Sequence, residues 1–156
     1  MTRWLTPEQQ RHWRAYIAAT ELLQDRLSRE LQTAHGLTMA DYEILVRLSE
    51  APDRQLRMSQ LADITLSSRS RLSHQIDRME KAGLVRREAC ESDRRGAHAV
   101  LTEHGWETLV EAAPTHVSGV REHFVDQLSE KEFAALGRAL AIVADHLQNG
   151  ERAEAV

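Results

Sequence analysis

The chain has 156 residues, of which 42% are hydrophobic and 28% charged, and its net charge is −4. This length suits one compact domain, and the composition is that of an ordinary soluble globular protein. No apolar run approaches the roughly 20 residues that a membrane helix needs, and the N-terminal MTRWLTPEQQ lacks the apolar core of a signal peptide. The lone Cys90 cannot form an internal disulfide. We therefore expect a cytoplasmic protein with no membrane partner.

The charge is unevenly distributed along the chain. Residues 54–96 carry 10 Lys and Arg against 6 Asp and Glu, a net charge of +4. Residues 1–53 carry a net charge of −2, and residues 97–156 carry −6. A basic middle between acidic flanks indicates either a local anionic partner or a solvated charged face.

Two helices are predicted in the first part of the chain. Thr6–Gln9 contains a candidate N-cap, a proline at the first helical position and a capping-box glutamine. This helix is expected to run to about Ala34 and to stop at Gly36. Thr38 is expected to cap a second helix, which ends before Pro52.

Two shorter helices joined by a turn are predicted in the basic middle. They span Ser59–Ile64 and Ser68–Ala82, and we expect the turn to bury Ile64 or Leu66. At about 100° per residue, the second of these helices places three apolar side chains in a narrow stripe that would face the core. These are Leu72, Ile76 and Met79.

The opposite face of this helix carries short hydroxyl and basic side chains. Such groups can donate hydrogen bonds to phosphates or to base edges. They are Ser70, Arg71, His74, Arg78 and Lys81, with Ser67 at the start of the helix. Asp77 also points outward, and we expect it to pair with Lys81 or Arg78. Arg69 lies nearer the apolar flank and is not expected to read bases.

After Gly83 the pattern changes from helical to extended. Leu84–Cys90 and Ala97–Leu101 predict two strands, joined by the polar loop Glu91–Gly96. A short helix, a turn, a second helix and a hairpin together form the winged helix-turn-helix arrangement. In it, the second helix reads the major groove and the hairpin places basic residues in the adjacent minor groove.

Two more helices are predicted after the hairpin. Thr102 is a candidate cap of a helix that reaches about Leu128, with a kink or a break near Ala113 because Pro114 lies inside it. Ser129–Glu132 is a capping box for the last helix, whose apolar residues repeat at spacings of 3 and 4. They are Phe133, Leu136, Leu140, Val143 and Leu147. Such a seam packs on another helix, either within the chain or between two subunits.

Three motifs occur in an order and spacing typical of one protein family. They are DRMEKAGLV at 77–85, DRR at 93–95 and LTEHG at 101–105. With them, about residues 10–148 of the chain resemble the MarR (multiple antibiotic resistance regulator) family of winged helix-turn-helix transcription regulators.

The resemblance implies a fold that is mainly α with a small β-hairpin wing. It implies one MarR-type domain over residues 1–156, with a winged helix-turn-helix lobe at about 38–101. A helical dimerisation region would be built from the N- and C-terminal helices, at about 7–35 and 102–148.

The resemblance also implies a transcription regulator that binds double-stranded DNA as a homodimer on an inverted-repeat operator, and we expect a repressor. By resemblance, the recognition-helix contacts to DNA come from Ser67, Ser68, Ser70, Arg71, His74 and Arg78. The wing contributes Arg94 and Arg95, with Asp93 bracing one of them and Gly96 shaping the hairpin tip. We expect Arg94 to enter the minor groove, and the resemblance leaves open which arginine Asp93 holds.

Members of the family commonly hold small aromatic ligands between the dimerisation helices and the DNA-binding lobe. A small aromatic effector that releases the protein from DNA is therefore an expectation by resemblance. Trp13, Tyr16 and Tyr42 are candidate lining residues, and core packing is the alternative role for them.

Other functions compete with this interpretation. An enzyme is not expected, because no phosphate-binding loop, nucleophile elbow or carboxylate pair occurs. No metal or cofactor is expected either: His116 and His123 stand about 10 Å apart along one helix, too far to share an ion. A redox-responsive regulator would use Cys90, for which we favour the role of a small half-buried thiol. A winged-helix protein-interaction module would need no basic face on its second helix, and this chain has one.

Overall fold

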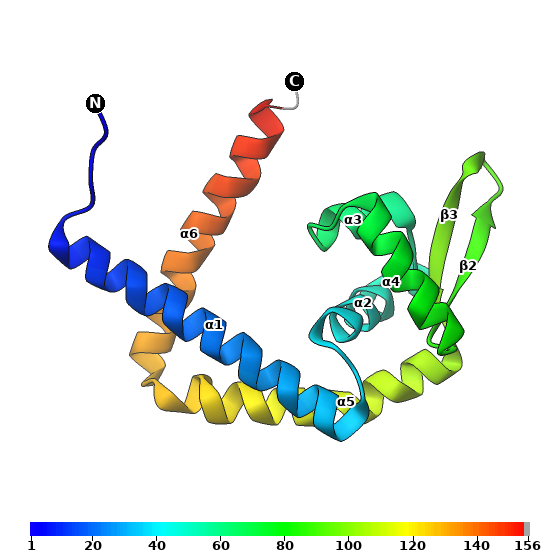
Figure 1. Ribbon diagram of the computed structural model, residues 1–156, viewed down its shortest axis with the longest axis horizontal. Coiled ribbons are helices and arrows are strands. Elements are labelled where there is room, and N and C mark those ends of the chain that lie inside the picture. The colour runs from blue at the N-terminus through cyan, green and yellow to red at the C-terminus, as the bar shows by residue number, and fades with distance from the viewer. Residues whose placement is uncertain (155–156) are drawn as a thin grey trace. The chain divides into compact units, whose positions relative to one another are not determined.

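Residues 1–154 are described by a computed structural model of the chain, with the side chains of residues 93–95 and 150–154 excepted (Figure 1). The elements are α1 (Pro7–His35), α2 (Met39–Glu50), the 3-10 turn η1 (Pro52–Arg54), β1 (Gln55–Arg57), α3 (Met58–Ile64), α4 (Arg69–Lys81), β2 (Val85–Cys90), β3 (Asp93–Leu101), α5 (Glu103–His123), the 3-10 turn η2 (Val125–Gln127) and α6 (Glu130–Glu154). The predicted fold class, mainly α with a small β wing, is confirmed. None of the helices in the described part of the chain is long and apolar enough to cross a membrane.

Internal contacts divide the chain into two compact units, Met1–Val117 and Ser118–Val156. The first unit holds the sheet, the helices α1 to α4 and most of α5. The second holds the end of α5, η2 and α6. The expectation of one MarR-type domain over residues 1–156 stays a prediction.

The predicted helix starts in the first unit are confirmed. The Thr6 hydroxyl accepts the Gln9 N–H, and the Gln9 side chain accepts the Thr6 N–H at 2.9 Å, which is a complete capping box. Gly36 ends α1 with φ +67°, a conformation that favours glycine. The Thr38 hydroxyl caps α2 by accepting the Asp41 N–H at 3.1 Å.

The sheet has three antiparallel strands in the order β1-β3-β2, and the sequence predicted two of them. The missed strand, β1, has only three residues, too few to show alternation. The hairpin is also longer than expected. Its turn is Glu91–Ser92, and Asp93–Gly96, predicted as loop, form the start of β3. Gly96 therefore lies within a strand, not at the tip.

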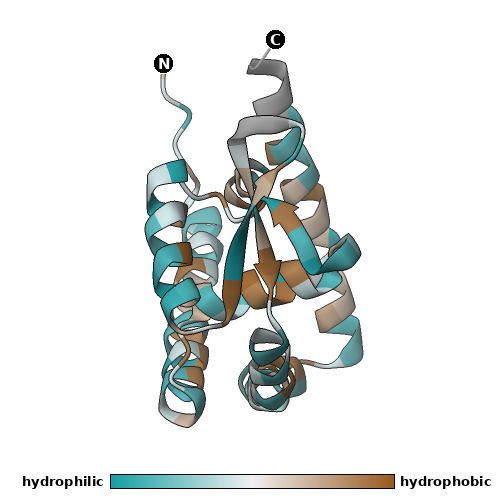
Figure 2. Cartoon of the chain, turned by 90° about the vertical axis from the view of Figure 1, so that its right-hand side faces the viewer, coloured by the Kyte–Doolittle hydropathy of each residue, from teal (hydrophilic) through white to brown (hydrophobic). Residues whose placement is uncertain are grey.

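The core of the first unit forms where α2, α3, α4 and α5 pack with the strands. Figure 2 shows hydrophobic segments in the sheet and hydrophilic turns on the outer helices. The predicted stripe of α4 is confirmed, because Leu72, Ile76 and Met79 are all buried. They pack in one cluster with apolar side chains of the neighbouring elements, among them Leu45, Leu48, Leu61, Val85, Ala99 and Leu109.

The turn between α3 and α4 is built differently from the prediction. Ile64 is 42% exposed and Leu66 is 86% exposed, so neither is buried. Leu66 adopts φ +51°, and the N–H groups of Leu66 and Ser67 donate back to the carbonyls of Asp63 and Ala62. Hydrogen bonds to the end of α3, and not apolar burial, therefore hold the turn.

The DRMEKAGLV motif ends α4 and begins the wing. Gly83 has φ +75°, and its N–H donates to the Glu80 carbonyl at 2.9 Å. The Leu84 N–H donates to the Met79 carbonyl at 3.0 Å. This pair of bonds is a Schellman motif, which satisfies the last carbonyls of the helix and turns the chain into β2.

The LTEHG motif joins the end of the wing to α5. The Thr102 hydroxyl donates to the Gly83 carbonyl at 2.6 Å, lies 3.0 Å from the Leu84 carbonyl and accepts the Gly105 N–H at 2.9 Å. Gly105 faces Leu84 so closely that a Cβ there would lie 2.0 Å from the Leu84 carbonyl oxygen. One threonine and one glycine thus fix the start of α5 against the exit from α4.

The sequence predicted a kink or a break near Ala113. There is no break, because α5 runs through Pro114 as one helix, and the kink stays a prediction. A proline inside a helix removes one hydrogen bond, here the one to the Val110 carbonyl. Val110 and Pro114 are both exposed, so water can serve that carbonyl. The helix ends at His123, before the predicted Leu128.

In the second unit, the capping box of α6 is confirmed. The Glu132 carboxylate accepts the Ser129 N–H at 2.9 Å, and the Ser129 hydroxyl accepts the Glu132 N–H at 3.3 Å. Most of the apolar seam that follows is exposed. Phe133, Leu140, Val143 and Leu147 are exposed, and Leu136 is half-buried.

Candidate nucleic-acid interface

The exposed face of α4 carries the residues predicted for the recognition helix. Ser68 caps the helix by accepting the Arg71 N–H at 3.1 Å, so its hydroxyl has an internal role. The other predicted side chains of the helix, Ser70, Arg71, His74 and Arg78, are exposed. Ser67, in the turn before the helix, is half-buried. The structure brings them together on the side opposite the core stripe. Their contacts with DNA stay predictions.

Arg78 differs from its neighbours because it already has a partner. Its Nη2 lies 3.6 Å from a carboxylate oxygen of Asp41, at the start of α2. The Gln75 amide donates to the same oxygen at 3.1 Å. Asp41 thus ties α4 to α2, while the Arg78 side chain stays 63% exposed and within reach of a second anion.

Arg87 in β2 fastens the wing to the recognition helix, and sequence reasoning missed it. Its guanidinium donates to the Asp77 carboxylate and, at 2.9 Å, to the Ser73 carbonyl. The Arg87 N–H also donates to the Glu80 carboxylate at 2.8 Å. The expected pairing of Asp77 with Lys81 or Arg78 is therefore wrong. Asp77 faces the wing strand.

Replacing Arg87 with alanine is expected to lower the free energy of unfolding by about 1–2 kcal/mol. Buried charge-assisted hydrogen bonds can each contribute more than this to stability. Asp77 and Glu80 are nearly half exposed, so solvent screens their interaction with Arg87 and reduces the effect. Arg86→Ala is the matched control, since among the described side chains the partner of Arg86 is Glu88 on its own strand. Its loss should change the stability by less than about 0.5 kcal/mol. Equal effects of both variants in urea titrations would contradict the role of Arg87.

The predicted wing residues Asp93, Arg94 and Arg95 have side chains outside the described part of the structure. Their backbone belongs to β3, directly after the hairpin turn. Ser92 in that turn accepts a hydrogen bond from Arg57 Nη2 at 3.2 Å. The wing tip is thereby linked to the start of α3.

The three aromatic residues expected to line an effector pocket lie in different places. Trp13 and Tyr16 stack on each other at 5.8 Å on α1 and are about half exposed. Tyr42 is 7% exposed and packs on His116 at 4.7 Å. About 28 Å of helix separates Tyr16 from His35, at the end of α1. The described pockets include none that is lined by all three residues, and their effector role stays a prediction.

His116 sits beside Tyr42 with its Nδ1 buried and without a hydrogen-bond partner. Burial lowers the pKa of His116 from the ordinary value of 6.5 and raises the pKa of Tyr42. The folded protein therefore keeps this imidazole neutral at a pH where the unfolded chain already binds a proton.

This burial predicts a loss of stability in mild acid. As the pH falls below about 6.5, the unfolded chain gains a proton that folded His116 rejects, so the free energy of unfolding decreases. His116→Phe should reduce this decrease, because it removes the buried imidazole. Urea titrations from pH 8 to pH 5 measure the free energy of unfolding of both proteins. Parallel pH dependences for the wild type and His116→Phe would refute the role of His116.

Cys90 is more enclosed than expected. Its side chain is 5% exposed, and its sulfur lies 3.2 Å from His98 Nδ1 on the paired strand. Among the described side chains, no group of three or more His, Cys, Asp or Glu is placed to hold a metal ion.

Comparison with known proteins identifies the family. Residues 35–96 match the family model described as MarR family. The transcriptional regulator PecS of Dickeya dadantii is 30% identical over 135 residues, which cover 85% of this chain and 80% of PecS. The crystal structure of AbsC, a MarR family transcriptional regulator from Streptomyces coelicolor, is similar with 55% identity and a TM-score of 0.89, over 95% of this chain and 99% of AbsC. This chain belongs to the MarR family.

The MarR family assignment makes the protein a transcriptional regulator and not an enzyme. A second Streptomyces coelicolor regulator of the family, Sco3205, has been crystallised in complex with DNA. It is 48% identical to this chain, with a TM-score of 0.90 over 95% of this chain and 92% of that one.

Proposed function

We propose that this MarR family protein binds a specific double-stranded DNA sequence through α4 and the wing. The observation that carries the proposal is the exposed face of α4, which bears hydroxyl and basic side chains. The apolar stripe on the other side of the helix is fully buried in the core, so this face points to the solvent. In the proposed complex, Ser70, Arg71 and His74 contact base edges or nearby phosphates in the major groove. Arg94 enters the minor groove from the wing. The DNA complex of Sco3205 supports this assignment.

The proposed functional form is a homodimer on an inverted-repeat operator. The exposed apolar seam of α6 supports a dimer, because a helix face of this kind needs a partner. Exposed Trp13 and Leu22 add apolar surface on α1. Two copies related by a twofold axis would read two half-sites about one helical turn apart.

The proposed outcome of binding is repression, since a dimer seated across an operator competes with other proteins for the same DNA. Release by a small aromatic ligand is the proposed mode of regulation. Such a ligand must bind one arrangement of the two DNA-binding lobes better than another, by typically about 1–3 kcal/mol. Titration of small aromatic acids against the protein–DNA complex tests this part separately.

Replacement of Arg71 or Arg94 by alanine is expected to weaken operator binding by about 1–3 kcal/mol without dissociating the dimer. The operator is first selected from a random duplex library, and binding is followed by fluorescence anisotropy. Arg47→Ala is the control, because it removes one charge from α2 at a residue paired with Glu43. Unchanged affinity of the Arg94 variant would remove that residue from the mechanism.

The alternative function is a protein-interaction module that does not bind DNA. A regulator that contacts several phosphates loses affinity steeply as the salt concentration rises. In a plot of the logarithm of the binding constant against the logarithm of the salt concentration, each neutralised phosphate adds about −0.9 to the slope. Binding to no duplex at any salt concentration would favour the alternative.

A further inference from the structure

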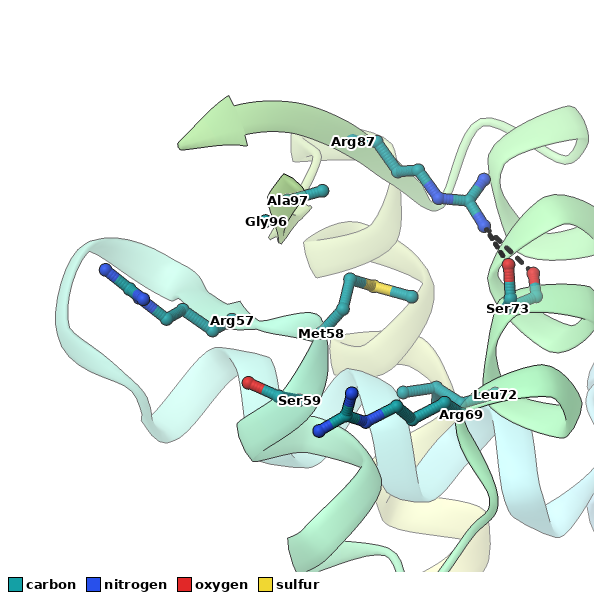
Figure 3. A pocket seen from close by; sticks show the side chains of 9 residues that line it. All are labelled: Arg57, Met58, Ser59, Arg69, Leu72, Ser73, Arg87, Gly96 and Ala97. Carbon is teal, nitrogen blue, oxygen red and sulfur yellow. Dashed lines mark hydrogen bonds between the residues drawn. The ribbon is translucent and has the colours of Figure 1, made fainter. Parts of the chain in front are cut away.

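A pocket of about 460 Å³ lies between the start of α3, α4 and the wing, within the first unit (Figure 3). Arg57 and Ser59 come from the β1–α3 junction, Arg69 from α4 and Arg87 from β2. Met58 and Leu72 contribute apolar lining. Arg57, Arg69 and Arg87, which come from three elements, therefore line one opening, and none of them belongs to the predicted set of DNA contacts.

The three arginines are not equivalent. The Arg87 guanidinium is occupied by Asp77, Glu80 and Ser73 (Figure 3 shows the bonds to Ser73). Arg57 donates to a neutral hydroxyl, that of Ser92. Among the described side chains, no carboxylate pairs with Arg57 or Arg69, and both are exposed. The pocket thus offers two guanidinium groups that pair with no carboxylate in the described part of the chain, and guanidinium is the chemistry that recognises phosphate.

The location of the pocket selects a DNA phosphodiester over a free anion. In the proposed complex α4 lies in the major groove and the wing in the adjacent minor groove. The sugar-phosphate strand that separates two neighbouring grooves must then pass between α4 and the wing, where the pocket opens. On the wing side, the described residues that line the pocket are the small Gly96 and Ala97 and the side chain of Arg87.

We infer that this pocket binds a backbone phosphate of the DNA, held by the guanidinium groups of Arg57 and Arg69. This inference rests on the proposed DNA-binding function and adds a contact that is independent of base sequence. Arg57 has a second, positioning role, because its bond to Ser92 links the phosphate site to the tip of the wing.

The test compares Arg57→Gln and Arg69→Gln with Arg47→Gln, a control that removes the same charge outside the pocket. Affinities for the selected operator and for an unrelated duplex are measured by anisotropy between about 50 and 300 mM salt. Each pocket variant should bind both duplexes about five- to tenfold more weakly than the wild-type protein. The dependence of the logarithm of its affinity on the logarithm of the salt concentration should become less steep, by about 1 for each protein chain bound to the DNA. Arg69→Lys should retain the slope, and thermal melts check that all variants fold.

Wild-type slopes in both pocket variants would overturn the inference while leaving the proposed function intact. A loss confined to the operator would also overturn it, because the arginines would then be reading bases. Tight binding of inorganic phosphate at constant ionic strength, abolished in both variants, would make the pocket a free-anion site instead. A wild-type protein that binds no duplex would overturn the proposed function and the inference together.

Discussion

Gly105→Ala is expected to lower the free energy of unfolding by about 2–4 kcal/mol. The added Cβ would lie 2.0 Å from the Leu84 carbonyl oxygen and 2.8 Å from a methyl carbon of Leu101. The nearest atom belongs to the backbone, so α5 or the start of the wing must shift. That shift would strain the bonds from Thr102 to Gly83 and Leu84. The higher helix propensity of alanine returns only about 1 kcal/mol.

Urea titrations at one fixed protein concentration measure this effect, since dimerisation would make stability depend on concentration. Glu107→Ala is the control, because Glu107 is an exposed residue of the same helix two positions later. Its stability should stay within about 0.5 kcal/mol of wild type. A Gly105→Ala protein as stable as this control would show that the LTEHG motif does not depend on a close approach of α5 to the wing.

The double substitution Leu140→Glu with Val143→Glu is expected to convert a dimer into monomers. Burial of a leucine or valine contributes about 1.5 kcal/mol or more, and a twofold interface counts each side chain twice. The pair should therefore remove roughly 6 kcal/mol or more of association free energy. Affinity for the two-half-site operator should fall more than about a hundredfold, because each lobe then binds alone.

Arg138→Glu serves as the control for this pair, since it changes the net charge by the same amount. Arg138 is exposed and lies on the side of α6 opposite Leu140. Sedimentation velocity at micromolar concentration distinguishes the species. A wild-type monomer, or a double variant that still sediments as a dimer, would refute the role of the α6 seam.

Local sequence patterns predicted most of the fold. Capping boxes at Thr6–Gln9 and Ser129–Glu132 marked helix starts, because their hydrogen bonds join residues three apart. The core stripe of α4 followed from helical periodicity alone. β1 and the outer half of the hairpin were missed for a common reason. Backbone pairing with a distant strand forms them, and their few or polar residues show no alternating pattern.

The candidate site was only partly predictable for the same reason. Helix geometry gave the exposed face of α4, including Arg71 and His74. The partners of Asp77 and Arg78 are Arg87 and Asp41, which lie on other elements and could not be inferred from spacing. Arg57 was overlooked because it belongs to β1, the strand that the sequence did not predict. Arg69 was considered only as a possible contact to DNA bases. The placement of Arg57 and Arg69 beside one pocket depends on packing, which periodicity does not encode.

Selection of duplexes from a random library by the wild-type protein, followed by sequencing, tests the central claim most directly. We expect one enriched inverted repeat, with half-site centres about one helical turn apart, bound in a salt-dependent manner. Enrichment of no sequence above the non-specific background would contradict the claim that this MarR family protein is a sequence-specific, dimeric DNA-binding regulator.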